Sequence, residues 1–218
     1  MGLPIGRRTC NALNAFWLFS AVVAAQQPGP NVKDCQPCTL ALGQKEPAFS
    51  FTFELKKDGD QRSVKAIRVV NPATGAIERL TVSDMEPIGS EDNFFFTAGD
   101  INFDGYPDLM LITNRGVVNA YADYWIYQPE KGIFAALGNY PIFKIEAKKQ
   151  RLATYERGGS AGLMYEAKEF AFVSGKLTVM REEKQDATDN PSTFRKVIRE
   201  RVNGVMKTIK TETVRAPQ

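Results

Sequence analysis

The chain has 218 residues, of which 43% are hydrophobic and 24% are charged, with a formal net charge of +3. This small net charge excludes strong electrostatic attraction as the basis for partner choice, so we expect no nucleic-acid partner. Histidine is absent, which excludes Ser-His-Asp and Cys-His catalysis and histidine-based metal chemistry. Carboxylates are plentiful, but no pair of them stands out, so we predict that the protein is not an enzyme.

The N-terminus has the pattern of a secretory signal. Arg7 and Arg8 form a basic region, and the apolar run ALNAFWLFSAVVAA ends in the small residues that a signal peptidase accepts. The run is too short for a comfortable membrane span. We therefore predict that residues 1–25 are removed and that the mature chain, without a membrane span, is periplasmic or secreted. The alternative is a buried N-terminal helix.

Residues 26–47 form a polar, proline-rich segment that contains Cys35 and Cys38 in the run DCQPC. In an oxidising compartment this spacing favours a small local disulfide. A redox pair would be expected beside a βαβ pattern, and zinc would need two further ligands that the chain does not offer. We predict the disulfide and keep the redox pair as the alternative.

Residues 48–215 have the pattern of one β domain. In PAFSFTFELKK, apolar side chains alternate with polar ones, as in a half-buried strand. SVKAIRVVNPATGAIERLTV indicates two strands around a turn, and AYADYWIYQPEKGIFAAL and EFAFVSGKLTVM have the same form. In the last of these, the turn is expected at Ser174-Gly175-Lys176. No repeat of 20–50 residues is present. The predicted fold is all-β: a single antiparallel β-sandwich or flattened barrel built of hairpins.

Two structures fit the C-terminal residues 194–215. The apolar residues recur at helical spacing, but Asn203-Gly204 lies in the middle, and this pair is a strong hairpin signal. A glycine inside a helix costs about 1 kcal/mol relative to alanine. We predict a long hairpin, with a helix as the alternative. We interpret its basic side chains as a solvated strand face rather than a site for an acidic partner.

The run AGDINFDGYPDLML, Ala98–Leu111, concentrates oxygen ligands in a short segment. Counted from Asp100, side-chain oxygens fall at positions one, three, five and nine, with a glycine at six and a carbonyl at seven, a flexible set that Ca²⁺ prefers over Mg²⁺. Leu111 replaces the glutamate of an EF-hand, and the flanks indicate strands. We predict one calcium-binding loop between β-strands; a plain Asp-Gly turn is the alternative. The predicted ligands are Asp100, Asn102, Asp104, Tyr106 through its carbonyl, and Asp108.

This loop resembles those of FG-GAP and related secreted β repeats, in which D-x-N-x-D-G-x-x-D-L joins two strands. With one copy and a signal peptide, the chain resembles small periplasmic calcium-binding β proteins related to i-type lysozyme inhibitors, some of which are immunity proteins against muramidases. A second stretch, YERGGSAGLMYE, resembles their Ser-Gly-x-x-Tyr inhibitory loop, although Ala161 separates Ser160 from Gly162. The resemblance covers roughly Ala98–Val179 and implies a peptidoglycan-cleaving glycosidase as the partner and Ca²⁺ as the cofactor.

The residues of the second stretch suit that role on physical grounds. A muramidase cleft holds two carboxylates about 5–9.5 Å apart, so a plug needs hydrogen-bond donors on a narrow tip. Glycines permit close approach, a serine adds a hydroxyl, and an arginine can bind a carboxylate through two hydrogen bonds. The alternative is an ordinary glycine-rich hairpin with Tyr165 in the core. The residues assigned to the inhibitor loop are Arg157, Gly159, Ser160, Gly162 and Tyr165.

A second function class stays open from the sequence. A calcium-binding β module could bind a carbohydrate or a surface protein without inhibiting an enzyme. Its platform would be the aromatic side chains of Tyr124, Trp125 and Tyr127, if they are exposed. The alternation of YADYWIYQPE also fits a core strand, in which these side chains would be buried.

Overall fold

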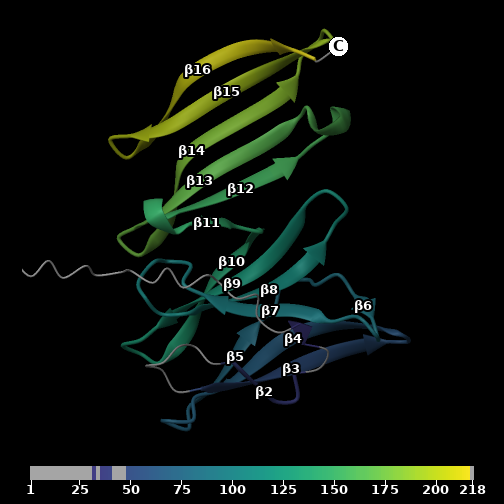
Figure 1. The fold of residues 1–218 in the computed structure, drawn as a ribbon, viewed down its shortest axis with the longest axis vertical. Helices are drawn as coiled ribbons and strands as arrows, with labels where there is room; N and C mark the ends of the chain where they lie inside the picture. The colour runs from purple at the N-terminus through teal and green to yellow at the C-terminus, as the bar shows by residue number, and fades with distance from the viewer. Residues whose placement is uncertain (1–30, 33–34, 41–47, 217–218) are drawn as a thin grey trace, which may run out of the picture.

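The computed structural model describes residues 31–32, 35–40 and 48–216. Within these ranges the fold is all-β and antiparallel, as predicted, and the sheets do not close into a barrel (Figure 1). The predicted signal peptide, residues 1–25, lies outside the described residues, as does most of the segment 26–47. No helix in the described part of the chain is long and apolar enough to cross a membrane.

The first sheet has the order β2-β3-β4-β5, and β6 pairs with β4 off this path. In β3, Phe49, Phe51 and Phe53 are buried, which confirms the predicted alternation. Cys35 and Cys38 form the predicted disulfide. The strands are β2 (Cys38–Leu40), β3 (Phe49–Asp58), β4 (Gln61–Val70), β5 (Ile77–Thr81) and β6 (Ile88–Gly89).

The second sheet has the order β1-β7-β8-β9-β10 and lies between the other two sheets (Figure 1). One of its faces packs on the first sheet around a core rich in aromatic side chains, in which the rings of Phe53 and Phe94 meet edge to face at 5.5 Å. Such ring pairs add stability beyond the area they bury. The strands are β1 (Asn31–Val32), β7 (Phe94–Gly99), β8 (Asp108–Arg115), β9 (Ala120–Gln128) and β10 (Ile133–Pro141).

The third sheet, in the order β11-β12-β13-β14-β15-β16, was not anticipated from the sequence. Part of it packs on the other face of the second sheet, where Tyr124 meets Leu152 and Phe170 in a second core. The second sheet is therefore covered on both faces. The strands are β11 (Lys144–Glu146), β12 (Arg151–Arg157), β13 (Tyr165–Val173), β14 (Lys176–Ala187), β15 (Thr193–Val202) and β16 (Val205–Arg215).

The outer strands of the third sheet extend beyond this second core (Figure 1). Asn203 and Gly204 both have positive φ angles, 52° and 80°, and join β15 to β16. Two such residues are the requirement of a tight type I′ hairpin turn. The predicted hairpin is confirmed, and the helical alternative is wrong.

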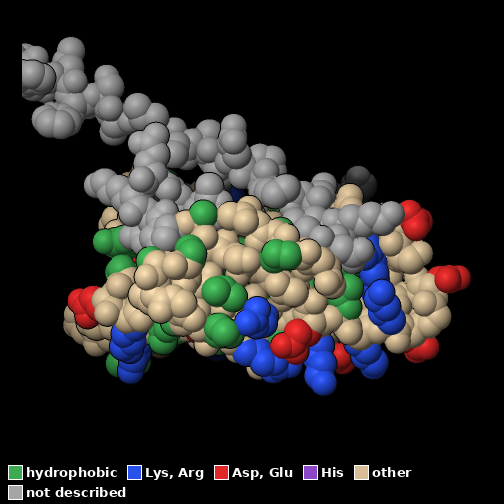
Figure 2. All heavy atoms as spheres, turned by 90° about the horizontal axis from the view of Figure 1, so that it is seen from below, with side chains coloured by type: hydrophobic (Ala, Val, Ile, Leu, Met, Phe, Trp, Pro, Cys, Tyr) green, Lys and Arg blue, Asp and Glu red, His purple; other side chains and the backbone are tan. Residues whose placement is uncertain are grey.

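The surface carries both signs of charge. Arg79 binds Glu54 across the outer face of the first sheet, with 2.7 Å between Nη2 and Oε2. Lys and Arg side chains lie beside Asp and Glu side chains along the described part of the face in Figure 2. Charges of mixed sign give this face no single field that would attract one class of charged partner.

Candidate functional site

The predicted calcium loop connects β7 to β8 and begins beside the strand pair Gly99 and Asp108. Strands flank it on both sides, as the sequence predicted. Its apolar residues anchor it in both cores: Ile101 is buried in the second core, whereas the ring of Tyr106 packs against the first. The loop therefore contacts both cores and connects them.

Side-chain oxygens of the predicted ligands accept hydrogen bonds from backbone amides of the same loop. The amide of Asp104 donates to Oδ1 of Asp100 and to Oδ1 of Asn102, both at 3.1 Å. The amide of Gly105 donates to Oδ2 of Asp100 at 3.0 Å. Gly105 has a φ of +88°, a conformation that glycine adopts without steric cost. Three of the five predicted ligands are thus gathered around one turn.

Asp108 lies beneath the loop and is fully buried. Its Oδ2 accepts hydrogen bonds from the amides of Ile101 and Asn102, at 2.8 and 3.2 Å, and its Oδ1 accepts one from Tyr127 at 2.9 Å. A carboxylate has about four acceptor positions, so one stays open. Asp108 therefore ties the loop to β9, a role that the sequence pattern did not indicate.

Burial affects two of the acids in and beside the loop, whereas Asp104 is exposed. Burial raises the pKa of Asp108 to about 7, although three backbone amides oppose this shift. Burial also raises the pKa of Asp100. No ion pair in the described part of the chain neutralises Asp100, Asp104 or Asp108. No three His, Cys, Asp or Glu side chains among the described residues form a metal-binding group, so a cation here would also need amide and carbonyl oxygens.

The second candidate site is the glycine loop, residues 158–164, which joins β12 to β13. At its base, the amide of Gly158 donates to the carbonyl of Met164 at 2.7 Å. A Cβ at Gly158 would lie 3.2 Å from both the Cβ and the carbonyl oxygen of Met164, so a side chain there would require the base of the loop to widen by a few tenths of an ångström. The tip, Gly159–Ala161, is exposed.

The tip of the glycine loop has a left-handed backbone. Ser160, Ala161 and Gly162 have φ angles of 55°, 54° and 86°. Each non-glycine residue in this conformation costs about 1–2 kcal/mol. Backbone strain of this kind concentrates at binding and catalytic sites, where the surrounding structure holds it in place.

Arg157 lies at the end of β12, and the side chain of Asn119 holds its backbone through two hydrogen bonds. Its amide donates to Oδ1 of Asn119 at 2.8 Å, and its carbonyl accepts from Nδ2 of the same side chain at 2.9 Å. The guanidinium lies over Gly162, where an added Cβ would be 3.3 Å from Nε. No carboxylate among the described residues forms an ion pair with Arg157, so the guanidinium is available to a partner.

Tyr165 is not a core residue, so the alternative interpretation of the glycine-rich hairpin is wrong on this point. Its ring stacks on Tyr155, with centroids 5.3 Å apart, and its hydroxyl donates to Oε1 of Glu183 at 2.7 Å. Tyr155 is 54% exposed, and sequence reasoning missed it. Its spacing of two residues from Arg157 on one strand could have indicated that both lie on the same face.

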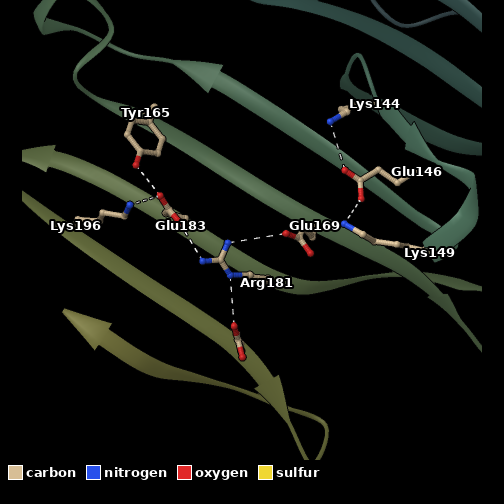
Figure 3. A network of polar contacts seen from close by, with 9 residues as sticks. Lys144, Glu146, Lys149, Tyr165, Glu169, Arg181, Glu183 and Lys196 are labelled. Carbon is tan, nitrogen blue, oxygen red and sulfur yellow. Dashed lines mark hydrogen bonds and ion pairs between the residues drawn. The ribbon is translucent and has the colours of Figure 1, made fainter. Parts of the chain in front are cut away.

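An ion-pair network holds Tyr165 in place (Figure 3). Glu183 binds Nζ of Lys196 at 2.6 Å and Nη2 of Arg181 at 3.1 Å, in addition to the tyrosine hydroxyl. Burial alone would raise the pKa of Glu183, but the hydrogen bonds from Lys196 and Tyr165 and the nearby cations outweigh burial and lower it. Glu183 is thus an ionised acceptor for the tyrosine.

The aromatic platform expected for the alternative function does not exist. Tyr124, Trp125 and Tyr127 are 2%, 2% and 4% exposed. Trp125 and Tyr127 pack in the first core and Tyr124 in the second, because β9 belongs to a sheet that is covered on both faces. The residues of β9 are structural.

Comparisons with known proteins give a fold but no family. No protein-family model matches the chain, and no curated protein matches it. A solved structure described as a "Xanthomonas Type IV Secretion System related protein" is similar, with a TM-score of 0.56 and 12% sequence identity. The alignment covers 85% of this chain and 97% of that one. At this identity the likeness shows that the two chains share a fold.

Proposed function

We propose that the chain is a periplasmic or secreted inhibitor of a lysozyme-like muramidase, with the glycine loop as its inhibitory segment and Ca²⁺ bound in the β7–β8 loop. The observation that carries this proposal is the exposed, left-handed tip beside Arg157, which forms no ion pair with a carboxylate of the described residues. A narrow tip that already has its bound shape loses little entropy on entering a cleft. Inhibition would then require no catalytic residue in this chain.

The chemistry of the glycine loop matches that of a glycosidase cleft. The guanidinium of Arg157 can form two parallel hydrogen bonds with a carboxylate, and the two acids that flank the scissile bond are such carboxylates. Ser160 adds a hydroxyl at the tip, and the stacked tyrosines add a flat, rigid surface beside it. Aromatic and arginine side chains supply most of the binding energy in many interfaces.

Calcium has a structural role in this proposal. The loop gathers carboxylate and amide oxygens around one turn, and burial raises the pKa of Asp100 and of Asp108. A divalent cation would supply the missing positive charge. Because the loop connects the two cores, Ca²⁺ would stabilise the fold without contacting the inhibited enzyme.

The test is a lytic assay on peptidoglycan with a panel of muramidases and residues 26–218 of the chain. We expect Arg157→Ala to weaken inhibition by about 2–5 kcal/mol, because a carboxylate of the enzyme would be left buried without a partner. Ser160→Ala should cost about 1.5–3 kcal/mol, the value of one hydrogen bond to a charged group. Arg151→Ala, the same change at the opposite end of β12, is the matched control and should have no effect.

Two results would contradict the proposal: a wild-type protein that inhibits no muramidase, or both loop variants retaining full inhibition. Binding to peptidoglycan or to a surface protein without inhibition would favour the alternative module. Tyr124, Trp125 and Tyr127 are buried, so they do not provide the exposed platform that this alternative requires.

A further inference from the structure

The second core contains an open cavity beside the start of the β7–β8 loop. This second-core cavity lies between the face of the second sheet formed by β7, β8 and β9 and residues 142–145, which lead from β10 into β11. Its volume is about 180 Å³. An apolar protein cavity of roughly 150 Å³ is large enough to hold one benzene molecule. The second-core cavity therefore has room for one small ring.

The walls of the second-core cavity are mainly apolar. Ile101 and Phe143 are buried in the second core, and Met110 and Ile145 pack against it. Ile142 is 38% exposed and is the one solvent-exposed residue of the wall in the described part of the chain, so it marks the opening. A small apolar molecule that entered here would remove its own surface and that of the walls from water, which is favourable.

One polar group in the wall has an unused hydrogen-bond donor. The ring of Tyr124 belongs to the second core, and the residue is 2% exposed. Its hydroxyl oxygen accepts a hydrogen bond from the amide of Phe143 at 3.0 Å, but no described residue accepts one from the hydroxyl. Burial raises the pKa of this hydroxyl to about 12, so it keeps its hydrogen at neutral pH. A tyrosine hydroxyl can donate and accept at once, and leaving a buried donor without an acceptor is unfavourable.

A water molecule is a poor match for the second-core cavity. A buried water is usually held by about three hydrogen bonds to polar groups. The other hydroxyl in the described wall, that of Thr97, donates to the carbonyl of Ala98 at 3.5 Å. The donor of Tyr124 alone is too little for a water. A molecule that is apolar over most of its surface and carries one acceptor matches both the walls and the donor.

We propose that the second-core cavity binds a small aromatic carbonyl compound, whose oxygen accepts a hydrogen bond from the hydroxyl of Tyr124. The cavity suits a ring because its walls include Phe95 and the rings of Tyr124 and Phe143, whose centroids are 4.8 Å apart. Aromatic rings pack favourably on one another in offset or edge-to-face arrangements. The ligand enters past Ile142, the exposed residue of the wall. This inference does not depend on the muramidase proposal.

The first test locates the site with acetophenone, which has one aromatic ring and one carbonyl group. The mature chain is labelled at its methionine and isoleucine methyl groups and titrated by NMR. The methyl signals of Met110, Ile142 and Ile145 should shift and reach saturation. Ile77, which is 61% exposed on the first sheet, is the control and should not shift. No saturable shift at the three wall residues, or equal shifts at Ile77, would overturn the proposal.

The second test concerns the hydrogen bond and compares acetophenone with α-methylstyrene, which has the same shape but a CH₂ group in place of the oxygen. Tyr124→Phe should weaken acetophenone binding about three- to tenfold, the value of one hydrogen bond, and change α-methylstyrene binding less than about twofold. Circular dichroism checks that the variant keeps the fold. Equal weakening of both compounds in a folded Tyr124→Phe variant would overturn the proposal.

A variant at the opening tests the cavity without changing the core. Ile142→Asp places a charge where the ligand enters and should weaken both compounds about tenfold or more, because the bound ligand would keep water from the carboxylate. Ile77→Asp makes the same change at an exposed position of the first sheet and should affect neither. Full binding by Ile142→Asp, or equal losses in the two variants, would show that the compounds bind elsewhere and would overturn the proposal.

Discussion

The β7–β8 loop and the glycine loop are both short connections between antiparallel strands, but they treat their polar groups in opposite ways. In the β7–β8 loop, Asp100, Asn102 and Asp108 turn inward and accept hydrogen bonds from nearby backbone amides. At the glycine loop, Ser160 and the adjoining Arg157 of β12 are exposed, and the backbone of the tip is left-handed. Changes in the first loop should therefore affect stability, and changes in the second should affect binding.

The largest expected effect is that of Asp108→Ala. The change leaves three backbone amides without their acceptor, and each such loss costs about 1–3 kcal/mol. We expect the free energy of unfolding to fall by at least about 3 kcal/mol in urea denaturation. Asp92→Ala is the control, because the Asp92 carboxylate accepts one amide hydrogen bond in an exposed turn. Equal losses in the two variants would remove the special role given to Asp108.

Calcium should stabilise the fold through the inward-turned loop. At a free concentration of 100 times its dissociation constant, a ligand that binds only the native state adds about 2.7 kcal/mol. We expect calcium to raise the melting temperature and Asp100→Ala combined with Asp104→Ala to abolish the rise. Thermal melts with calcium or with a chelator measure this. A wild-type melting curve that does not respond to calcium would show that the site assignment is wrong.

Ala161→Gly tests the strain in the glycine loop. Glycine adopts a positive φ without the cost of about 1–2 kcal/mol that alanine bears, although it loses more entropy on folding. We expect a small net gain in stability, about 0.5–1 kcal/mol, together with weaker inhibition because the tip is less rigid. Ala153→Gly, in the extended strand β12, should instead destabilise the protein by about 0.5–1 kcal/mol. Loss of stability in both variants would argue against strain at the tip.

The smallest effect is expected for the cysteines. Cys35 and Cys38 close a ring of only a few residues, so their disulfide restricts the unfolded chain little. Titration of the secreted, unreduced protein should find no free thiol at either position, and mild reduction should leave inhibition unchanged. Two reactive thiols in the unreduced protein would contradict the assignment.

Local patterns in the sequence predicted the hairpins but not the arrangement of the sheets. Ser174-Gly175 and Asn203-Gly204 indicated tight turns, and all four residues have positive φ angles. The third sheet was missed because no alternation pattern shows whether a strand is covered on one face or two. For the same reason the sequence left open whether the aromatic residues of β9 form an exposed platform or belong to a core strand, and the structure buries them. Burial of both faces depends on distant segments, which local spacing does not encode.

In the candidate sites, too, the sequence predicted the contacts within one turn but not the contacts between strands. The positions of Asp100, Asn102 and Asp104 follow from spacing around a turn, which is local, and the structure brings these side chains together. The bonding of Asp108 to Tyr127 and the stacking of Tyr155 on Tyr165 join different strands. Such contacts depend on strand register, which one sequence specifies only weakly before the partner strand is known.

The simple strand order of the third sheet has a consequence for how it folds. From β11 to β16 every strand pairs with its neighbour in the sequence, so each step of assembly closes only a short loop. The sheet can therefore grow one hairpin at a time from β12 and β13, which pack on the second sheet, toward β16, whose one paired neighbour among the described strands is β15. Amide hydrogens should exchange with solvent progressively faster along that direction, with the final strand opening first.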